Sequence, residues 1–377
     1  MNEDTAAPLL KDGFNVATVE WIARSIAAVH RPFPSKRFVA DCLDGFDALS
    51  LMARVGRVAQ GLVRHLPAPF EQAVAVLQQA MGEPGAPSRE VQGMAAFRHA
   101  PHLQFVADAG IGHPEAALDA LAWMTRHFSG EFAVRPFLQR DPTSTLACMQ
   151  RWCTHDDPRV RRLASEGSRP LLPWARRVSH LVDDPSLTVP LIDALAGDAD
   201  EVVRRSAANH LNDISRLDPA LAVEVARGWI GRGWPDGERT VNRGLRTLIK
   251  QGHPQALALL GFAVDDAFVI DGPELDRWRV PIGGRLALRF ALRRTDATPA
   301  AACVDYAVCY ASANGAARRK VFKGEVRQVE PGRTESFEFV RDFVVRTTRR
   351  LYPGAHRVEV LVNGRVLGAA DFQLTET

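Results

Sequence analysis

The stretch WCTHDDPRVRRLASEGSRPLLPW, residues 152–174, contains the repeat that decides the fold of this chain. Its central triplet Val160-Arg161-Arg162 recurs as Val203-Arg204-Arg205, and the interval, 203 − 160 = 43 residues, is that of a HEAT-type helical repeat. A helix pair that cannot bury its apolar face alone stacks on its neighbours. The recurrence therefore predicts a curved array of helix pairs.

Prolines that follow a capping residue predict where the helices of this array begin. Proline is favoured in the first turn of a helix, and an aspartate just before it accepts hydrogen bonds from the free N–H groups of that turn. We expect first-turn prolines at Pro114, Pro142, Pro158, Pro185 and Pro219, the last four preceded by Asp141, Asp157, Asp184 and Asp218. Val134-Arg135 and Val241-Asn242-Arg243 continue the valine–arginine pattern, with the valines facing the core.

Near residue 265 the apolar spacing changes from the helical period of about 3.6 to the strand period of about 2. Alternating apolar positions are Leu286, Leu288, Phe290 and Leu292, then Val304, Tyr306, Val308 and Tyr310. Asn314-Gly315 and Asn363-Gly364 are typical of two-residue hairpins. The predicted fold class is mainly α: a HEAT-like α–α superhelical solenoid over residues 1–264, followed by a small all-β immunoglobulin-like sandwich over 265–377.

The basic residues are almost all arginine. Lysine is found only at positions 11, 36, 250, 320 and 323, so 47 − 5 = 42 of the basic residues are arginine. A GC-rich genome explains such a bias without any function, whereas clustered arginines would indicate bidentate contacts to phosphate. The net charge of +3 by itself argues little about partners.

The 5 cysteines form no CxxC pair and no Cys/His spacing typical of zinc sites, so neither a metal nor another cofactor is expected. Scattered free thiols are typical of a reducing cytoplasm. The N-terminal segment lacks the features of a signal peptide, and no apolar run approaches the roughly 18 residues of a membrane span. We expect a cytoplasmic monomer without a membrane partner.

Arginines recur at similar positions of the stacked helices and would form a continuous basic track. One pair of arginines is more simply a solvated helix face, but the repetition suits the phosphates of double-stranded DNA. The candidates for DNA binding are Arg135, Arg159, Arg161, Arg162, Arg169, Arg204, Arg205, Arg243 and Arg246.

Three carboxylates, Asp156, Glu131 and Glu166, are the candidates for catalysis. Each has a plainer interpretation as well. Asp156 can be an exposed loop acid, and Glu131 stands early in a helix, where acids are favoured. Glu166 can pair with Arg162, four residues earlier.

Three tryptophans, Trp123, Trp152 and Trp174, recur near these acids. A tryptophan at helical spacing is most simply a core residue. Alternatively, the three form an aromatic wall that stacks on a base or attracts a cationic one.

Residues 128–139, FSGEFAVRPFLQ, and residues 152–174, which include RRLASEGSRPLLPW, resemble the AlkC family of bacterial alkylbase DNA glycosylases. The helical array followed by an immunoglobulin-like domain resembles the longer branch of that family over essentially the whole chain. The resemblance implies hydrolysis of the N-glycosidic bond of cationic N3-alkylated bases, such as 3-methyladenine and 3-methylcytosine. It also implies action on duplex DNA without deep base flipping, by a protein associated with the nucleoid when bound.

The related AlkD branch places tryptophans and an aspartate against the lesion deoxyribose. The resemblance puts that pair near Glu131 and Arg135, where neither residue type is kept, so we assign the carboxylate role to Glu131 and Asp156. The tail of the first Val-Arg-Arg copy, with Glu166, Arg169 and Trp174, does not recur after the second. This asymmetry places the expected active site near the first copy.

A cationic alkylated base is already a good leaving group and needs little general-acid help. Bond breakage leaves positive charge on the sugar, which a nearby carboxylate would stabilise while orienting the attacking water. Two alternatives stay open: a non-catalytic HEAT scaffold that binds DNA or a protein partner, and an unrelated peptide-binding solenoid. Only the glycosylase needs carboxylates and aromatics on the basic face, and outward-pointing Asp156 and Glu131 would favour the scaffold.

The sandwich is expected to clasp the duplex, because basic residues gather in its strands and hairpins. They are Arg318, Arg319, Lys320, Lys323, Arg346, Arg349 and Arg350.

Overall fold

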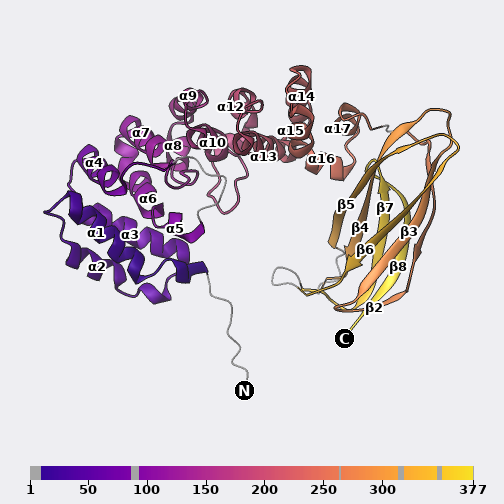
Figure 1. Cartoon of the computed structure of the whole chain (residues 1–377), viewed down its shortest axis with the longest axis horizontal. Coiled ribbons are helices and arrows are strands. Elements are labelled where there is room, and N and C mark those ends of the chain that lie inside the picture. The colour runs from indigo at the N-terminus through magenta and orange to yellow at the C-terminus, as the bar shows by residue number, and fades with distance from the viewer. Residues whose placement is uncertain (1–9, 86–92, 263–264, 313–317, 346–349, 377) are drawn as a thin grey trace. The chain divides into compact units, whose positions relative to one another are not determined.

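The computed structural model describes residues 10–85, 93–262, 265–312, 318–345 and 350–376. The chain forms two compact units, the first made of Met1–Leu221 and Gly228–Gly244, the second of Ala222–Arg227 and Leu245–Thr377. Helices build the first unit, and a β-sandwich makes up most of the second (Figure 1). The predicted fold class is confirmed. Among the described residues, no helix is long and apolar enough to cross a membrane.

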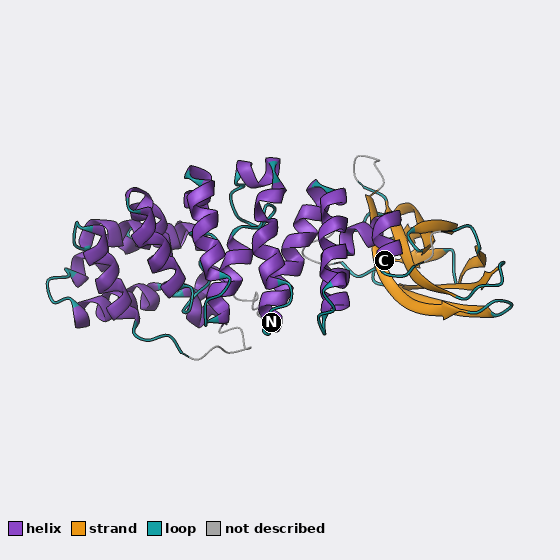
Figure 2. Cartoon of the chain, turned by 90° about the horizontal axis from the view of Figure 1, so that it is seen from above, coloured by secondary structure: helices purple, strands orange, loops and turns teal. Residues whose placement is uncertain are grey.

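The helical unit is an array of short helices that stand side by side (Figure 2). Its first helices are α1 (Val16–Val29), α2 (Ser35–Leu43), α3 (Leu51–His65), α4 (Phe70–Met81), α5 (Gly93–Phe97), α6 (Ala100–Ala109) and α7 (Pro114–Met124). They are followed by α8 (Arg135–Arg140), α9 (Pro142–Trp152), α10 (Pro158–Gly167), α11 (Ser179–Asp183), α12 (Val189–Leu195), α13 (Glu201–Leu217), α14 (Pro219–Gly231) and α15 (Gly237–Gly244). Short 3-10 turns precede α1, α3, α7 and α12.

The aspartate–proline signals begin helices as predicted. Asp141 accepts a hydrogen bond from Ser144 N at 3.0 Å, and Asp157 from Arg159 N at 2.9 Å. Asp218 caps α14 in the same way, and Asp184 caps a short 3-10 turn at residues 185–188. Local capping chemistry is therefore a sufficient explanation for where these elements start.

The two copies of the Val-Arg-Arg triplet occupy equivalent places in α10 and α13. Val160 and Val203 are both fully buried. The first arginine of each copy folds back onto the turn before its own helix. Arg161 Nη1 donates to the carbonyls of His155 and Asp156 at 2.8 and 3.0 Å. Arg204 Nη1 donates to two carbonyls of the corresponding turn, at 2.7 and 3.0 Å.

The same two arginines also reach the following repeat. Arg161 makes a bidentate pair with Asp198, at 2.6 and 2.9 Å, and Arg204 pairs with Asp236 at 2.6 Å. The guanidinium N–H groups of Arg161 and Arg204 therefore bind groups of the protein itself. The repeated arginine links consecutive helical repeats, a structural role that the sequence did not reveal.

Helices α16 (Arg246–Gln251) and α17 (Pro254–Leu259) fall in the second unit with the strands. A Cβ added to Gly364, in the β7–β8 turn, would lie only 1.9 Å from the Cα of Gly252, which ends α16. Only glycine permits this backbone approach.

The domain boundary predicted between residues 264 and 265 separates the helices from the strands. The two compact units, in contrast, divide after Gly244.

The sandwich consists of two sheets with strand orders β1-β3-β6 and β2-β8-β7-β4-β5. All neighbouring strands are antiparallel except β2 and β8. The strands are β1 (Phe268–Leu275), β2 (Arg279–Pro281), β3 (Arg285–Arg294), β4 (Ala300–Tyr310), β5 (Arg318–Val329), β6 (Thr334–Asp342), β7 (Gly354–Val362) and β8 (Arg365–Thr375).

The predicted alternation forms the core of this sandwich. Every alternating position named above, from Leu286 to Tyr310, is buried. The Asn363-Gly364 hairpin joins β7 to β8, with φ of 48° and 77°, the left-handed values that such a turn requires. Asn314-Gly315 lies outside the described residues.

We predict that His210 makes the helical unit sensitive to acid. This fully buried imidazole contacts Ser165 O and Thr188 Oγ1, both at 2.9 Å, and burial lowers its pKa from 6.5 to about 4. Between these values the unfolded chain binds a proton that the folded chain does not. The contribution of neutral His210 to the free energy of unfolding is complete above pH 6.5. Between pH 6.5 and about pH 4 it falls by about 1.4 kcal/mol for each pH unit.

Urea denaturation at pH 7 and pH 5 tests this prediction with His210→Gln. The variant should lose less stability than the wild type between the two pH values, by about 2 kcal/mol. His180→Gln, at an exposed position of α11, is the matched control and should follow the wild type. Equal pH dependence of all three proteins would contradict the assignment.

Candidate active site

Charged side chains from neighbouring helices form one cluster in the helical unit. Glu131 lies in the turn between α7 and α8, Arg162 and Glu166 lie in α10, Arg169 stands two residues after the end of α10, and Asp213 lies in α13. The structure thus brings together two of the three carboxylates expected from the sequence, and adds a third that sequence reasoning missed.

Arg162 lies between Glu131 and Glu166. Its Nη1 donates to Glu131 Oε2 at 3.1 Å and to Ser129 Oγ at 2.8 Å, while its Nη2 lies 3.7 Å from Glu166 Oε2. The Ser129 hydroxyl donates in turn to Glu131 Oε2. Both carboxylates therefore face one guanidinium, which is itself partly exposed.

Glu166 is buried and held on both oxygens. Oε1 accepts from Arg169 Nη1 at 2.7 Å, and Oε2 accepts from Ser206 Oγ at 2.7 Å. Burial alone would raise the pKa of Glu166, but the charges of Arg162 and Arg169 and the hydrogen bond from Ser206 lower it overall. Glu166 is therefore a carboxylate that is ionised at neutral pH and fixed in position.

Arg169 extends this network to α13. Its Nε and Nη2 donate to the two oxygens of Asp213 at 2.9 and 3.0 Å, and Asp213 also accepts from Leu171 N at 3.2 Å. Arg169 and Asp213 are both buried. Asp213 was missed because it lies 44 residues from its partner, and no local pattern connects the two.

The cluster has an excess of negative charge. Glu131, Glu166 and Asp213 contribute −3, and Arg162 and Arg169 contribute +2, which leaves a formal charge of −1. In a partly buried site of low effective dielectric, such a charge attracts a cation more strongly than it would in water.

Asp156 does not belong to this cluster. It is exposed in the turn before α10, where its backbone carbonyl accepts from Arg161. The adjacent Asp157 caps α10 and pairs with Arg159 and Arg126, at 2.6 and 3.1 Å. Although burial opposes ionisation, these hydrogen bonds and charges bring the pKa of Asp157 to about 2. Asp157 is therefore a structural cap.

The three tryptophans occupy different environments. Trp152, the last residue of α9, is buried, and Trp123 in α7 packs against His127 with ring centroids 4.9 Å apart. Trp174 is 100% exposed and adopts a left-handed φ of 62°. That conformation costs a non-glycine residue about 1–2 kcal/mol, and such strain is concentrated at functional sites. Of the three, only Trp174 presents its whole ring to a ligand.

The predicted DNA-binding arginines also differ in environment. Arg135, Arg159, Arg161, Arg169 and Arg204 donate to backbone carbonyls or carboxylates of the protein. Arg205 and Arg243 are exposed and line a shallow hollow between α13 and α15, together with Arg239. Arg246 is half-buried in α16.

Comparisons with known proteins agree with this architecture. A family model described as "Uncharacterised protein YhaZ, C-terminal Ig-like domain" matches residues 269–376. The uncharacterised protein YhaZ of Bacillus subtilis is 32% identical over 366 residues, which cover 97% of this chain and 99% of that protein.

A solved structure extends the similarity to three dimensions. It is the alkylpurine DNA glycosylase AlkC of Pseudomonas fluorescens, bound to DNA that contains an abasic-site analogue. It is 36% identical, with a TM-score of 0.89, over 98% of this chain and 100% of that chain. With such identity along nearly its whole length, this chain belongs to the family that includes YhaZ and AlkC.

Proposed function

We propose that this protein is a DNA glycosylase that hydrolyses the N-glycosidic bond of cationic N3-alkylated bases, such as 3-methyladenine and 3-methylcytosine, in duplex DNA. The observation that carries the proposal is the partly buried carboxylate–arginine cluster with its excess negative charge. The full-length similarity to a DNA-bound alkylpurine glycosylase supports it.

The proposed chemistry follows from where charge develops. An alkylated cationic base leaves readily, and positive charge then accumulates on the deoxyribose. The partly exposed Glu131 would lie nearest to this sugar, with Glu166 behind it and fixed by Arg169 and Ser206. Their negative charge stabilises the oxocarbenium-like sugar, and a free carboxylate lone pair can orient the attacking water. A neutral base is a much poorer leaving group, and stabilisation of the sugar alone would not release it at a useful rate.

The exposed, strained Trp174 is proposed to contact the DNA at the lesion. Its ring is available for stacking, because it is not packed against the protein. Arg205 and Arg243 are proposed to contact phosphates along the same face. The lesion would thus be recognised at the surface, without deep base flipping.

A non-catalytic DNA-binding scaffold is the second candidate. The exposed side chain of Asp156 favours it, because a scaffold needs no carboxylate on the DNA face. Glu131, however, points toward Arg162 within the protein cluster. A scaffold gives no reason for three acids gathered around two arginines, so we favour the enzyme.

We predict that Glu166→Gln and Glu131→Gln each slow single-turnover release of 3-methyladenine from alkylated DNA by about 100-fold or more. Removing one charge-stabilising group from a preorganised site has an effect of that order. Glutamine keeps an oxygen that can accept the hydrogen bonds of Ser206 and Ser129. Circular dichroism and thermal melting would verify that the variants are folded.

Asp156→Asn is the matched control, since it removes one negative charge from an exposed position near the same helix. We expect it to change the rate less than about threefold. A large loss in this variant, with normal rates in the two glutamine variants, would move the catalytic role to Asp156 and contradict the cluster assignment.

We predict that the sandwich contributes to DNA binding. Arg318 and Lys323 are exposed on β5, whereas Arg346 and Arg349 lie outside the described residues. Arg318→Ala with Lys323→Ala in the full chain should weaken duplex binding and reduce the slope of log affinity against log salt by about 1 for each lost phosphate contact. Arg293→Ala, exposed on β3 of the other sheet, is the control. Unchanged binding and slope in the double variant would contradict a DNA contact by the sandwich. Normal binding after removal of residues 265–377 would contradict it as well.

A further inference from the structure

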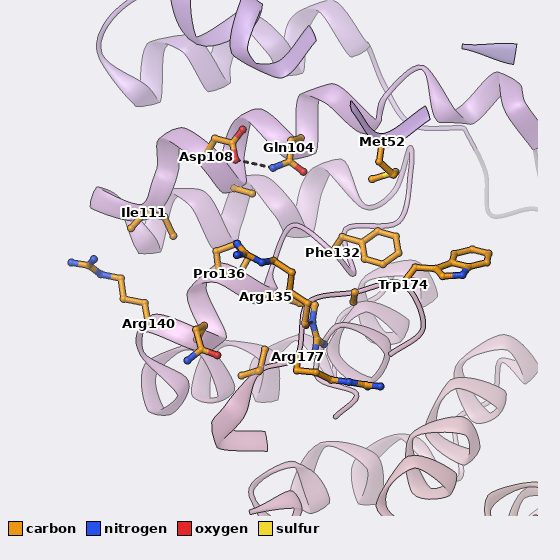
Figure 3. Close-up of a pocket in the computed structure, with 15 residues that line it drawn as sticks. Met52, Gln104, Asp108, Ile111, Phe132, Arg135, Pro136, Arg140, Trp174 and Arg177 are labelled. Carbon is orange, nitrogen blue, oxygen red and sulfur yellow. Dashed lines mark hydrogen bonds between the residues drawn. The ribbon is translucent and has the colours of Figure 1, made fainter. Parts of the chain in front are cut away.

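A cavity of about 690 Å³ lies in the helical unit, between α3, α6, α8 and residues 174–178 (Figure 3). None of the cluster residues Glu131, Arg162 and Glu166 lines it, but Phe132, next to Glu131, and the proposed DNA-contacting Trp174 do, so the cavity adjoins the proposed lesion site. Its size is typical of sites that take a small organic ligand.

The charge of this cavity is strongly positive. Arg135, Arg140, Arg176 and Arg177 line it, and Asp108 is the one carboxylate among the lining residues, so the formal charge is 4 − 1 = +3. Asp108 is already engaged by Gln104 Nε2 at 2.7 Å. The ligand that suits these walls is therefore anionic.

Arg135 gives the clearest sign that an anion belongs nearby. Its side chain is only 3% exposed and donates to the carbonyls of Arg176, Gly167 and Arg169, at 2.7, 3.0 and 3.0 Å. Unlike Arg169, it makes no direct ion pair among the described residues: the charge of Asp213 acts on it from a distance, but Asp213 is bonded to Arg169, and the Nη2 of Arg135 has no acceptor there. A buried guanidinium with an unsatisfied nitrogen and no ion pair is costly, and an anion in the adjoining cavity would offset that cost.

The same cavity has aromatic and apolar walls. Phe132 and Trp174 lie on one side of it in Figure 3, with Arg177 below them. Pro136 and Ile111 add apolar surface on the opposite side (Figure 3). Aromatic rings beside guanidiniums form a suitable environment for a nucleobase that carries a phosphate, because the base stacks while the phosphate accepts charge-assisted hydrogen bonds.

We propose that this cavity binds a nucleotide unit, with its base against Phe132 and Trp174 and its phosphate at Arg176 and Arg177. The nucleotide can be a free mononucleotide or an unpaired nucleotide of bound DNA, since both present the same groups. The site goes beyond the proposed glycosylase function, because binding here requires no bond cleavage.

Isothermal titration of the full chain with deoxyadenosine monophosphate tests the site. We expect a dissociation constant on the order of 10 to 100 µM. Binding should be at least ~10-fold tighter than that of deoxyadenosine or of inorganic phosphate, measured at the same ionic strength. The double variant Arg176→Ala with Arg177→Ala should weaken binding by ~10-fold or more, because it leaves the backbone contacts of Arg135 in place.

Arg151→Ala is the matched control, since Arg151 is exposed on α9 and does not line the cavity. It should bind the nucleotide as the wild type does. The proposal is overturned if deoxyadenosine monophosphate binds no more tightly than inorganic phosphate, or if the double variant binds it normally.

A second arm distinguishes the two sources of the nucleotide. Duplex DNA with 2-aminopurine opposite an abasic-site analogue reports stacking of the unpaired base as a fall in fluorescence. A fall that deoxyadenosine monophosphate reverses, and that the double variant lacks, identifies the DNA nucleotide as the occupant. Tight binding of the mononucleotide without such a fall identifies the free nucleotide. These readouts do not depend on base release, so failure of the glycosylase proposal would leave them interpretable.

Discussion

The Arg169 guanidinium, held between Glu166 and Asp213, is the interaction on which the site depends. It joins the end of α10 to the middle of α13 and so links two consecutive repeats of the array. All three side chains are buried, so removing Arg169 would leave two buried carboxylates without their partner, at a cost of about 3–5 kcal/mol. The same arginine fixes the catalytic candidate Glu166, so one hydrogen-bond network both holds the two repeats together and positions the site.

The helical repeats use arginine in two ways. The first arginine of each Val-Arg-Arg triplet is used for structure, because Arg161 and Arg204 link their own turns to the next repeat. The second arginine differs between the copies: Arg162 faces two carboxylates, whereas Arg205 is exposed. The two copies therefore share the packing of the valine and the first arginine and differ in the surroundings of the second arginine. An enzyme for cationic substrates needs such a local excess of acid on a basic surface.

Local signals predicted the fold well. Aspartate–proline pairs act within one turn of a helix, and alternating apolar residues act within one strand, so both can be read from adjacent residues. The site depended on contacts between distant residues. Glu131 and Glu166 were identified, but Ser129, Ser206 and Asp213 were not. Their partners Arg162, Glu166 and Arg169 lie 33, 40 and 44 residues away in the sequence, so no local pattern connects them.

The tryptophans illustrate the same limit of sequence patterns. Trp152 ends a helix and faces the core, while Trp174 follows Pro173 in a non-helical segment and is fully exposed. Residue type alone does not separate them, but the proline before Trp174 was an available signal. Arg135 likewise matched the expected arginine pattern, yet it is buried and supports the segment that carries Trp174.

The central claim is that the carboxylate cluster binds positive charge on the sugar. The most direct measurement compares the affinity of the protein for duplex DNA that contains a cationic pyrrolidine abasic analogue with its affinity for DNA that contains the neutral tetrahydrofuran analogue. We predict that the wild type binds the cationic analogue at least ~10-fold more tightly, and that Glu131→Gln with Glu166→Gln abolishes the preference. Equal affinities in the wild type, or a preference that survives in the double variant, would contradict the account.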